Sequence, residues 1–319
     1  MAIKTAIIGL GIMGRRMLAQ MQAHTGFAPQ FLWDPNATAC QAALDEAPDA
    51  LITQTAEAAI TACDLVYLAC PPAPRKAFAL MAAKAGKAVF LEKPLGIDIE
   101  SSRDLVAQLT GFGVPAAVNF TQAAGPALTD VAAAAVKGDL GKLVGADIVE
   151  TYGAWPREWQ KAADWLRFRA EGGMTREVIS HFLFFSERIL GPLELVWARP
   201  DYPADPALCE TGMLARLVGA SGSVVNVMAS VGGVQPDRQE LTIMGTKTSR
   251  RISNFYQDSI SDGSDFNPVP PKGDPRSVNL QAQLGDLIKL MNGQPNRLAT
   301  PAEALRVQIL IEGMLAGKG

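Results

Sequence analysis

Three glycines close to the start of the chain have the spacing of a phosphate-binding turn. Gly9, Gly11 and Gly14 form the pattern G-x-G-x-x-G between an apolar run and a helical pattern, which is the context that this motif requires. Gly9 permits a tight turn, Gly11 lets the backbone approach a pyrophosphate, and Gly14 allows close packing of helix on strand. Ile12 and Met13 would begin the helix, whose N-terminus carries partial positive charge. The motif predicts a dinucleotide site.

An acidic residue follows at the distance that such a site needs. Asp34 closes a second apolar run, twenty residues after Gly14. A carboxylate there accepts hydrogen bonds from a ribose 2′-hydroxyl and repels a 2′-phosphate. We therefore expect NAD as the cofactor, and Arg15 and Arg16 leave NADP as the open alternative.

The ends of the next apolar runs carry the other residues that we expect at this site. In an open parallel sheet, ligands bind outside the carboxyl ends of the strands. The expected cofactor-binding residues at these ends are Cys70, Pro71, Pro72, Glu92, Lys93 and Asn119. Cys70 is expected to line the site rather than act as a nucleophile, because nothing nearby in the sequence would favour its thiolate. Pro94 favours an extended backbone at Lys93 and stops the strand from pairing further.

Alternating strands and helices must position these residues. Over residues 1–119, the short runs are apolar throughout and helical patterns follow them, which predicts a parallel sheet covered on both faces. We therefore expect an α/β fold that begins with a doubly wound, NAD(P)-binding Rossmann domain. Asp98 has the position of an N-cap for one of its helices.

The pattern changes over residues 120–319, for which we expect an α+β domain. Runs rich in Thr and Val begin near residue 193, and Gly, Pro and Asp separate them, which indicates a mainly antiparallel sheet. The stretch 257–277 contains four prolines and is expected to be a loop. Thr300 and Glu303 have the spacing of a capping box for a C-terminal helix, which could pack back on the first domain.

The composition excludes several classes of partner and site. The chain has 319 residues and a net charge of −3, so nothing draws it to nucleic acid or to an anionic membrane. No apolar run is long enough to span a membrane. The four cysteines form no C-x-x-C pair and there are only two histidines, so we expect neither a metal site nor a disulfide framework. A reducing cytoplasm is the expected location.

Motifs along the whole chain resemble those of the glucose–fructose oxidoreductase / inositol dehydrogenase / MocA (Gfo/Idh/MocA) family. The matching segments are AIIGLGIMG at 6–14, AGKAVFLEKPLGIDIESSRDLV at 85–106, GDLGKL at 138–143, GGMTREVISH at 172–181, ELTIMGTK at 240–247 and PAEALRVQILIEGML at 301–315. The resemblance implies an NAD(P)-dependent oxidoreductase. Such an enzyme transfers a hydride between nicotinamide and a secondary alcohol or carbonyl of a sugar, a cyclitol or a sugar-derived molecule.

The resemblance also implies the catalytic residues. The lysine of the family's E-K-P motif reaches the substrate carbon that exchanges hydride; here it is Lys93, whose ammonium would stabilise a developing alkoxide. Glu177 and His181 match the family's acidic residue and histidine, and their spacing puts them on one face of a helix. By resemblance, His181 exchanges the hydroxyl proton, and Glu177 orients the histidine or binds substrate hydroxyls.

Three positions depart from the family's pattern. Glu177 replaces the usual aspartate, Phe184 stands where an aspartate is often found, and Arg75 stands where many relatives have histidine. These differences bear on the substrate class more than on the chemistry. The second histidine, His24, ends the first predicted helix and is expected to be solvated.

A loop rich in tryptophan and arginine precedes the helix with His181. Indole faces suit the C–H faces of sugars, and arginines suit hydroxyls or a carboxylate. The expected substrate-binding residues are Lys93, Thr121, Trp155, Trp165, Arg167, Glu177 and His181, with Asn119 and Gln122 as further polar candidates. Packing or a subunit contact is the alternative function of this loop.

The expected partners are a small polyhydroxylated substrate and further copies of the chain. The resemblance implies a homodimer or homotetramer that pairs the sheet of the second, substrate-binding domain. Three alternatives stay open: a reductase of a different carbonyl or imine substrate that bears a carboxylate, a nucleotide-binding sensor on the same fold, and a structural homo-oligomer. Lys93 and His181 argue against the sensor, because a sensor needs no proton relay.

Overall fold

The chain divides into two compact units, and each is described by itself. The computed structural model describes residues 2–271 and 273–318. The first unit comprises Met1–Ala124 and Ser277–Leu305, and the second comprises Gly125–Arg276 and Arg306–Gly319. The sequence predicts a second domain over residues 120–319, with a C-terminal helix that could pack back on the first domain. Residues 277–305 instead belong to the first unit, because their apolar side chains join its core.

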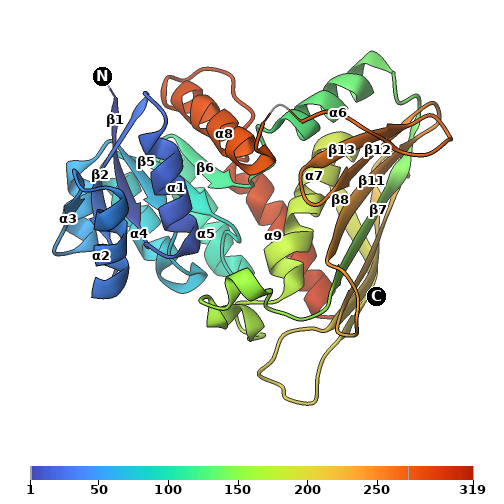
Figure 1. Cartoon of the computed structure of the whole chain (residues 1–319), viewed down its shortest axis with the longest axis horizontal. Coiled ribbons are helices and arrows are strands. Elements are labelled where there is room, and N and C mark those ends of the chain that lie inside the picture. Colours follow the sequence, from blue (N-terminus) through green and yellow to red (C-terminus); the bar gives the residue numbers. More distant parts are fainter. Residues whose placement is uncertain (1, 272, 319) are drawn as a thin grey trace. The chain divides into compact units, whose positions relative to one another are not determined.

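A six-stranded parallel sheet runs through the first unit (Figure 1), which confirms the predicted doubly wound fold. The strand order is β3-β2-β1-β4-β5-β6. The strands are β1 (Ile3–Ile8), β2 (Phe27–Trp33), β3 (Leu51–Ile52), β4 (Leu65–Leu68), β5 (Ala88–Glu92) and β6 (Ala116–Asn119). The helices between them are α1 (Ile12–Gln22), α2 (Ala37–Glu46), α3 (Ala56–Ala62), α4 (Pro72–Lys84) and α5 (Ile99–Phe112). The order reverses between β1 and β4, whose carboxyl ends therefore flank the ligand crevice of this sheet type.

A helix late in the sequence completes the core of this unit. Helix α8 (Pro275–Met291) contributes Leu280, Leu284 and Leu287, which recur at helical spacing and are buried against side chains of the sheet and of α1. Burying one such side chain contributes roughly 1.5–3 kcal/mol. The first unit therefore depends on residues from both parts of the chain that form it.

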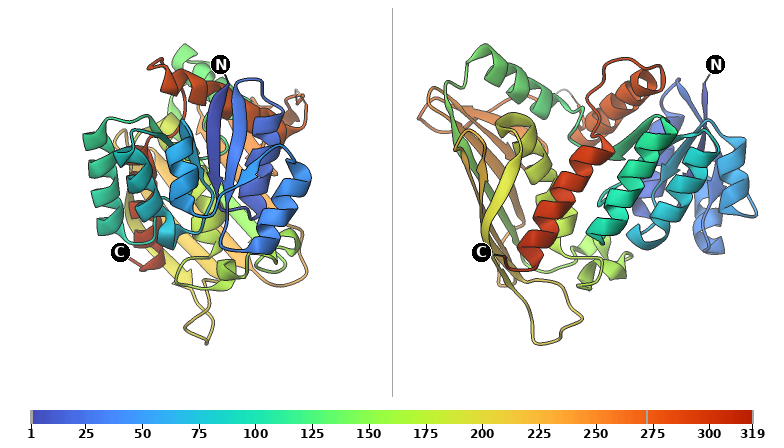
Figure 2. Two further views of the ribbon diagram at one scale, coloured as in Figure 1. Left: turned by 90° about the vertical axis from the view of Figure 1, so that its left-hand side faces the viewer. Right: turned by 180° about the vertical axis from the view of Figure 1, so that it is seen from behind.

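An eight-stranded sheet forms the second unit and is antiparallel except where β7 pairs with β10, which confirms the mainly antiparallel prediction. Its order is β14-β13-β12-β11-β7-β10-β9-β8. The strands are β7 (Leu143–Tyr152), β8 (Leu193–Asp201), β9 (Gly212–Gly219), β10 (Val224–Val231), β11 (Arg238–Gly245), β12 (Ser249–Ser253), β13 (Gln257–Ser261) and β14 (Asn267–Pro268). Helix α7 (Ser180–Leu190) lies along one face of this sheet, and no helix of the described chain covers the other face (Figures 1 and 2). Helix α6 (Pro126–Lys137) precedes β7.

The loop predicted over residues 257–277 is wrong in part, because this range contains strand β13 and the short strand β14, and helix α8 begins before its end. Strand β13 occupies 257–261 and pairs with β12. Its polar sequence hid this strand, because the buried carboxylate of Asp258 is neutralised by the guanidinium of Arg250 on β12, at 3.0 Å from Nε. A buried ion pair thus replaces the apolar side chain by which a strand is normally recognised.

The predicted helix caps are confirmed. The carboxylate of Asp98 accepts the N–H of Ser101 at 2.6 Å and caps α5. The Thr300 hydroxyl accepts the N–H of Glu303 at 3.2 Å, and the Glu303 carboxylate accepts the N–H of Thr300 at 2.9 Å, which is the reciprocal capping box at the start of α9 (Pro301–Leu315). None of the helices in the described part of the chain is long and apolar enough to cross a membrane.

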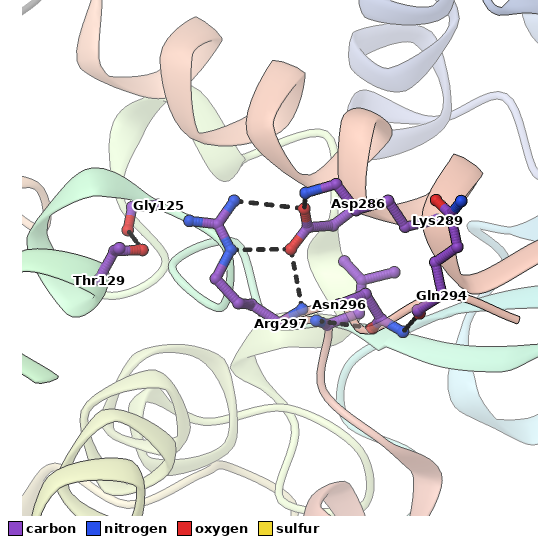
Figure 3. Close-up of polar contacts among 8 residues, drawn as sticks. Gly125, Thr129, Asp286, Lys289, Gln294, Asn296 and Arg297 are labelled. Atoms are coloured by element: carbon purple, nitrogen blue, oxygen red, sulfur yellow. Dashed lines mark hydrogen bonds and ion pairs between the residues drawn. The ribbon is translucent and has the colours of Figure 1, made fainter. Parts of the chain in front are cut away.

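Asp286 on α8 holds the segment that follows this helix (Figure 3). Its Oδ2 accepts the backbone N–H and the Nε–H of Arg297, both at 2.8 Å, and its Oδ1 accepts from Lys289 Nζ at 2.8 Å. The carboxylate is only 1% exposed. Burial raises the pKa of Asp286, but these donors outweigh burial and lower the pKa to about 2. The carboxylate therefore stays charged inside the folded unit.

Asp286→Asn should lower the free energy of unfolding at neutral pH by about 2 kcal/mol. The folded carboxyl has a pKa of about 2 against 3.8 ordinarily, so its stabilisation is complete above pH 4 and is lost as the pH falls toward 2. Urea unfolding between pH 4 and pH 2 should show this loss of stability in the wild type. The control Asp49→Asn, which changes an exposed carboxylate, should show the same loss. An Asp286→Asn variant with the same acid sensitivity as the wild type would contradict this assignment.

Candidate active site

The first unit holds the glycine turn in the conformation that its pattern predicts. Gly9 has φ +96°, and a Cβ there would lie 2.6 Å from the backbone nitrogen of Cys70. A Cβ at Gly14 would overlap the carbonyl oxygen of Gly9. Only glycine therefore lets α1 begin so close to the end of β1. Because Gly9 follows β1 and Cys70 follows β4, the turn lies at the point where the strand order reverses.

Gly11 and Asp34 offer the space and the acceptor that a dinucleotide needs. Gly11 is the N-cap of α1, and a Cβ built on it meets no atom within 4 Å. The Asp34 carboxylate accepts the N–H of Leu10 at 2.7 Å and the N–H of Asn36 at 2.8 Å. These bonds fix it after β2, and each oxygen keeps a lone pair for a ribose hydroxyl. The residues present therefore fit a dinucleotide cofactor.

Alanine should have different effects at Gly11 and at Gly14. Gly11→Ala should change the free energy of unfolding by less than about 0.5 kcal/mol, because its methyl group meets no protein atom. The same methyl group should weaken NADH binding roughly tenfold or more, since it fills the space of the pyrophosphate. Gly14→Ala should destabilise the protein by about 1–3 kcal/mol through overlap with the Gly9 carbonyl. Thermal unfolding and NADH titration by fluorescence measure the two effects, and equal destabilisation would contradict the geometry.

Arg75, on α4, holds the segment that carries Lys93. Its guanidinium is 2% exposed and donates to the carbonyl oxygens of Cys70 at 2.6 Å, of Glu92 at 2.7 Å, and of Pro94. Burial lowers the pKa of Arg75, yet a guanidinium stays protonated in proteins. Two of its acceptors flank Lys93 in the chain, so Arg75 fixes the backbone on both sides of that residue. Lys93 itself is half-buried, and the Lys93–Pro94 peptide is cis.

Glu92 and Asn119, both expected at the cofactor site, bond to each other in the interior. Asn119 Nδ2 donates to Glu92 Oε1 at 2.6 Å, and the Tyr67 hydroxyl donates to the same carboxylate. Gln283 Nε2, from α8, donates to Asn119 Oδ1 at 2.8 Å. Burial raises the pKa of Glu92, and the Tyr67 hydrogen bond and the charge of Lys93 oppose that rise. This chain of hydrogen bonds fixes Glu92, the residue before Lys93, in the interior. Direct contact of Glu92 and Asn119 with a cofactor stays a prediction.

Cys70 is buried and its thiol is inert by environment. Burial raises its pKa, and the charge of Arg75 opposes the rise without reversing it. A thiol with a raised pKa is a poor nucleophile at neutral pH. The expected part of Cys70 as a lining residue agrees with this environment.

Two adjacent glycines open the second motif, in the second unit. A Cβ at Gly172 would overlap the carbonyl oxygen of Leu166. Gly173 has φ +102°, and a Cβ there would overlap the carboxylate of Glu210. Glu210 Oε1 in turn accepts the N–H of Thr175 at 2.8 Å, at the start of the helical segment. Both positions therefore require glycine, because the chain passes between a backbone and a buried carboxylate.

The helical segment of this motif begins as a π-helix. Thr175–Ile179 is π-helical and continues directly as α7. Glu177 lies in the π segment and His181 in the first turn of α7, whereas we had expected one regular α-helix. Single π turns inside α-helices occur frequently at functional sites, because the wider turn redirects side chains. The irregularity coincides with the two residues to which the resemblance gives catalytic roles.

Residues distant in sequence hold Glu177 and His181. Gln160, which is 1% exposed, donates from Nε2 to Glu177 Oε1 at 3.1 Å. The buried His181 ring packs edge-to-face on Phe255, with 4.8 Å between ring centroids. Phe255 lies in the turn between β12 and β13 with φ 70°, a conformation that bulky residues rarely adopt. The sequence did not reveal Gln160 or Phe255, since neither belongs to a motif.

Some polar side chains of the loop before this motif bond to other residues of the same loop. Trp155 Nε1 donates to the carbonyl oxygen of Leu166 at 3.0 Å. Arg167 is exposed and pairs with Asp164 at 2.9 Å. Trp165 is half-buried. Contact of Trp155, Trp165 and Arg167 with substrate stays a prediction.

The candidate residues fall into two groups, one in each unit. The first unit contains Thr121 and the residues expected to bind the cofactor: Gly9, Gly11, Ile12, Met13, Gly14, Asp34, Cys70, Pro71, Pro72, Glu92, Lys93 and Asn119. The second unit groups Glu177 and His181 on one helical segment and holds Trp155, Trp165 and Arg167 in the preceding loop. Thr121 is buried, and its carbonyl oxygen accepts from Gln283 at 3.3 Å.

Comparison with solved structures identifies the fold. The chain is similar to UDP-N-acetylglucosamine 3-dehydrogenase from Acidithiobacillus ferrooxidans, with a TM-score of 0.81 and 18% identity over 100% of this chain and 98% of that one. It is similar to an oxidoreductase from Agrobacterium radiobacter in complex with NAD+, L-tartaric acid and magnesium (TM-score 0.85, 17% identity, 99% and 97% covered). It is also similar to a dehydrogenase from Bordetella pertussis in complex with NADH and UDP-GlcNAcA (TM-score 0.82, 20% identity, 98% and 95% covered).

Comparison of the sequence with families gives the assignment. No curated protein matches the chain significantly. Residues 3–120 match the model of the Gfo/Idh/MocA family, described as an oxidoreductase family with an NAD-binding Rossmann fold. This range contains the glycine turn, Asp34 and the E-K-P segment, and it confirms the resemblance seen in those motifs. Residues 3–120 of the chain thus match the NAD-binding Rossmann domain of the Gfo/Idh/MocA oxidoreductase family.

Proposed function

We propose that this protein is an NAD-dependent dehydrogenase that oxidises a secondary alcohol of a sugar, a cyclitol or a sugar-derived molecule, or reduces the corresponding carbonyl. The observation that carries this proposal is the environment of Lys93. A buried guanidinium binds the carbonyl oxygens before and after this lysine, at the carboxyl end of the strand β5 in an NAD-binding sheet. Such an arrangement fixes the backbone from which the Lys93 ammonium extends, which supports a catalytic role because such a role requires a well-positioned group.

The chain's own residues would divide the work of alcohol oxidation. Gly9, Gly11 and Gly14 would hold the pyrophosphate and Asp34 the adenosine ribose. When bound, NAD supplies the acceptor for a hydride. Lys93 would hold the substrate oxygen and stabilise negative charge as it develops there.

Proton transfer would fall to the second unit. His181 would take the hydroxyl proton as the hydride leaves carbon, so that the products are the carbonyl compound, NADH and a protonated imidazole. Glu177 would orient His181 or a substrate hydroxyl, and Gln160 holds its carboxylate at 3.1 Å for either task. The reverse sequence would reduce the carbonyl.

We also propose a sugar-derived substrate, a homo-oligomeric state and a cytoplasmic location for the protein. The protein from Acidithiobacillus ferrooxidans is named for its action on UDP-N-acetylglucosamine, and the one from Bordetella pertussis was solved with UDP-GlcNAcA. Both compounds are sugar nucleotides, which supports a sugar-derived substrate for this protein. A homodimer or homotetramer would form through the sheet face that carries no helix among the described residues. The cytoplasm is the proposed location, since the described cysteines are all free thiols.

The test is a cofactor-absorbance screen at 340 nm. Purified protein would receive NAD or NADP with aldoses, ketoses, inositols, sugar acids and nucleotide sugars, and Lys93→Ala and His181→Ala would serve as inactive controls. Turnover that both variants lose would support the proposal. NADH binding without turnover of any substrate would favour a sensor and refute it.

Asp34→Ala should narrow the preference for NAD over NADP. The variant loses the acceptor for the 2′-hydroxyl and the charge that repels a 2′-phosphate, so the ratio of the two dissociation constants should shift by roughly tenfold or more. Fluorescence titration with NADH and NADPH measures the ratio without any substrate. An unchanged ratio would contradict the position of the ribose at Asp34.

A further inference from the structure

A single arginine of the second unit lies among three aromatic rings. The guanidinium carbon of Arg157 is 4.8 Å from the ring centroid of Trp159, 5.3 Å from that of Tyr152 and 5.8 Å from that of Trp155. Its Nε donates to Gln160 Oε1 at 2.9 Å. Aromatic rings stabilise a cation over their faces and restrict the rotation of its planar group. Arg157 is therefore held in one orientation.

The outer edge of the Arg157 guanidinium, formed by Nη1 and Nη2, donates no hydrogen bond to an acceptor in residues 2–271 and 273–318. Several other arginines use this edge on acceptors of the protein itself: Arg75 on backbone carbonyls, Arg176 on Glu312, Arg250 on Asp258 and Arg297 on Asp286. The acidic residues nearest to Arg157 in sequence are also engaged, since Glu158 pairs with Lys161 and Asp164 with Arg167. Nη1 and Nη2 of Arg157 thus remain available to a ligand.

Gln160 connects this cation to the motif with the proposed catalytic residues. The amide accepts from Arg157 through Oε1 and donates to Glu177 Oε1 through Nε2, at 2.9 and 3.1 Å. Gln160 is 1% exposed, so water does not compete for its two hydrogen bonds, and the amide couples the position of Arg157 to that of Glu177. A group bound to Arg157 would therefore be connected to Glu177 through one buried side chain, that of Gln160.

A second cation reaches the same cluster. The guanidinium carbon of Arg276 is 5.7 Å from the Trp159 ring centroid, and its side chain pairs with no carboxylate of the described chain. Trp159 is 43% exposed despite its size. Two positive charges near one exposed indole repel each other, and an anion bound to either guanidinium would reduce this repulsion.

We propose that Arg157, supported by Arg276, binds an anionic group of the substrate, either a carboxylate or a phosphate. This inference rests on the proposed function, because it names the charge class of the substrate for that same site. The planar edge of a guanidinium matches two oxygens of either group with parallel hydrogen bonds. A sugar acid, a sugar phosphate and a nucleotide sugar all carry such oxygens, whereas a neutral sugar or a cyclitol has none.

Calorimetric titration of NADH-loaded protein tests the proposal. The probes are glucuronate for the carboxylate, glucose 6-phosphate and UDP-glucose for the phosphate, and glucose as the uncharged reference. At least one anionic probe should bind tenfold or more tightly than glucose, and Arg157→Gln should raise its dissociation constant at least tenfold. Lys161→Gln removes the same charge from the same loop and should leave the constant within twofold. Arg157→Lys keeps the positive charge but loses the pair of parallel N–H donors, so it should retain only part of the affinity for the anionic probe.

The outcomes separate this inference from the proposed function. A preference for glucuronate identifies a carboxylate, and a preference for either phosphate probe identifies a phosphate. Binding of glucose as tightly as the anions, an effect of Arg157→Gln no larger than that of Lys161→Gln, or no binding of any anion would each overturn the inference. Turnover of a neutral sugar would support the dehydrogenase without the anion site. Anion binding without hydride transfer from any alcohol would support the anion site without the dehydrogenase. Thermal unfolding of Arg157→Gln excludes a loss of fold as the cause.

Discussion

Lys93→Met should lower kcat roughly 10²–10³-fold while the dissociation constant of NADH stays within a factor of two. Methionine keeps the length of the side chain and removes the ammonium, so the variant loses the charge that stabilises the substrate oxygen as it becomes negative. The backbone position should survive, because Arg75 binds the carbonyl oxygens of Glu92 and Pro94 and not the lysine side chain. Steady-state kinetics with the best substrate of the screen and fluorescence titration with NADH measure the two quantities.

The control for this variant is Lys84→Met, which removes an exposed lysine at the end of α4 in the same unit. It should leave both kcat and NADH affinity unchanged. A Lys93→Met enzyme that keeps its kcat and only raises KM would show that the ammonium binds substrate and transition state equally. That result would remove Lys93 from the proposed chemistry.

His181→Ala should lower kcat roughly 10²–10⁴-fold, because the hydroxyl proton loses its acceptor. The residues expected to bind the cofactor all lie in the first unit, so NADH affinity should not change. In the direction of alcohol oxidation, the base must be neutral, and the wild-type rate should fall toward acidic pH. The variant should lose this acidic limb, and the pH dependence of kcat/KM measures it.

The other histidine supplies the matched control. His24 is half-buried rather than solvated, and its Nδ1 accepts the N–H of Gly26 at 3.0 Å. His24→Gln should therefore cost stability but leave the pH–rate profile unchanged. If the acidic limb disappears in His24→Gln, or persists in His181→Ala, then the proton acceptor is not His181.

The fold of the first unit and its glycine turn could be predicted from sequence because their signals are local. The glycine spacing, Asp34 and the apolar strands lie within short segments, and each follows from the conformation of a few neighbouring residues. The same holds for the caps at Asp98 and Thr300, where the donor and the acceptor are three residues apart. The sheet order and the family match agree with these local predictions.

The supporting contacts could not be predicted, because they join segments that are distant in sequence. Arg75 looked like a departure from a family pattern, and only the fold shows that it binds the backbone on either side of Lys93. Gly173 looked like one of a glycine pair, and only the fold shows the carboxylate of Glu210 beside it. Strand β13 escaped notice because an ion pair between neighbouring strands replaced the apolar pattern. In each case, a polar group has a partner that no sequence period reveals.

The discontinuity of the first unit sets an order of events during synthesis. The ribosome completes residues 2–124 before it has made any of the second unit, yet the core of the first unit includes Leu280, Leu284 and Leu287. Until α8 emerges, the nascent sheet and α1 must keep an apolar side uncovered, which is the kind of surface that chaperones bind and that aggregates when left alone. The second unit is discontinuous as well, since it also needs residues 306–319, so neither unit is complete until the end of the chain has been made. The NAD-binding domain therefore starts the chain but is among the last parts of it to be finished.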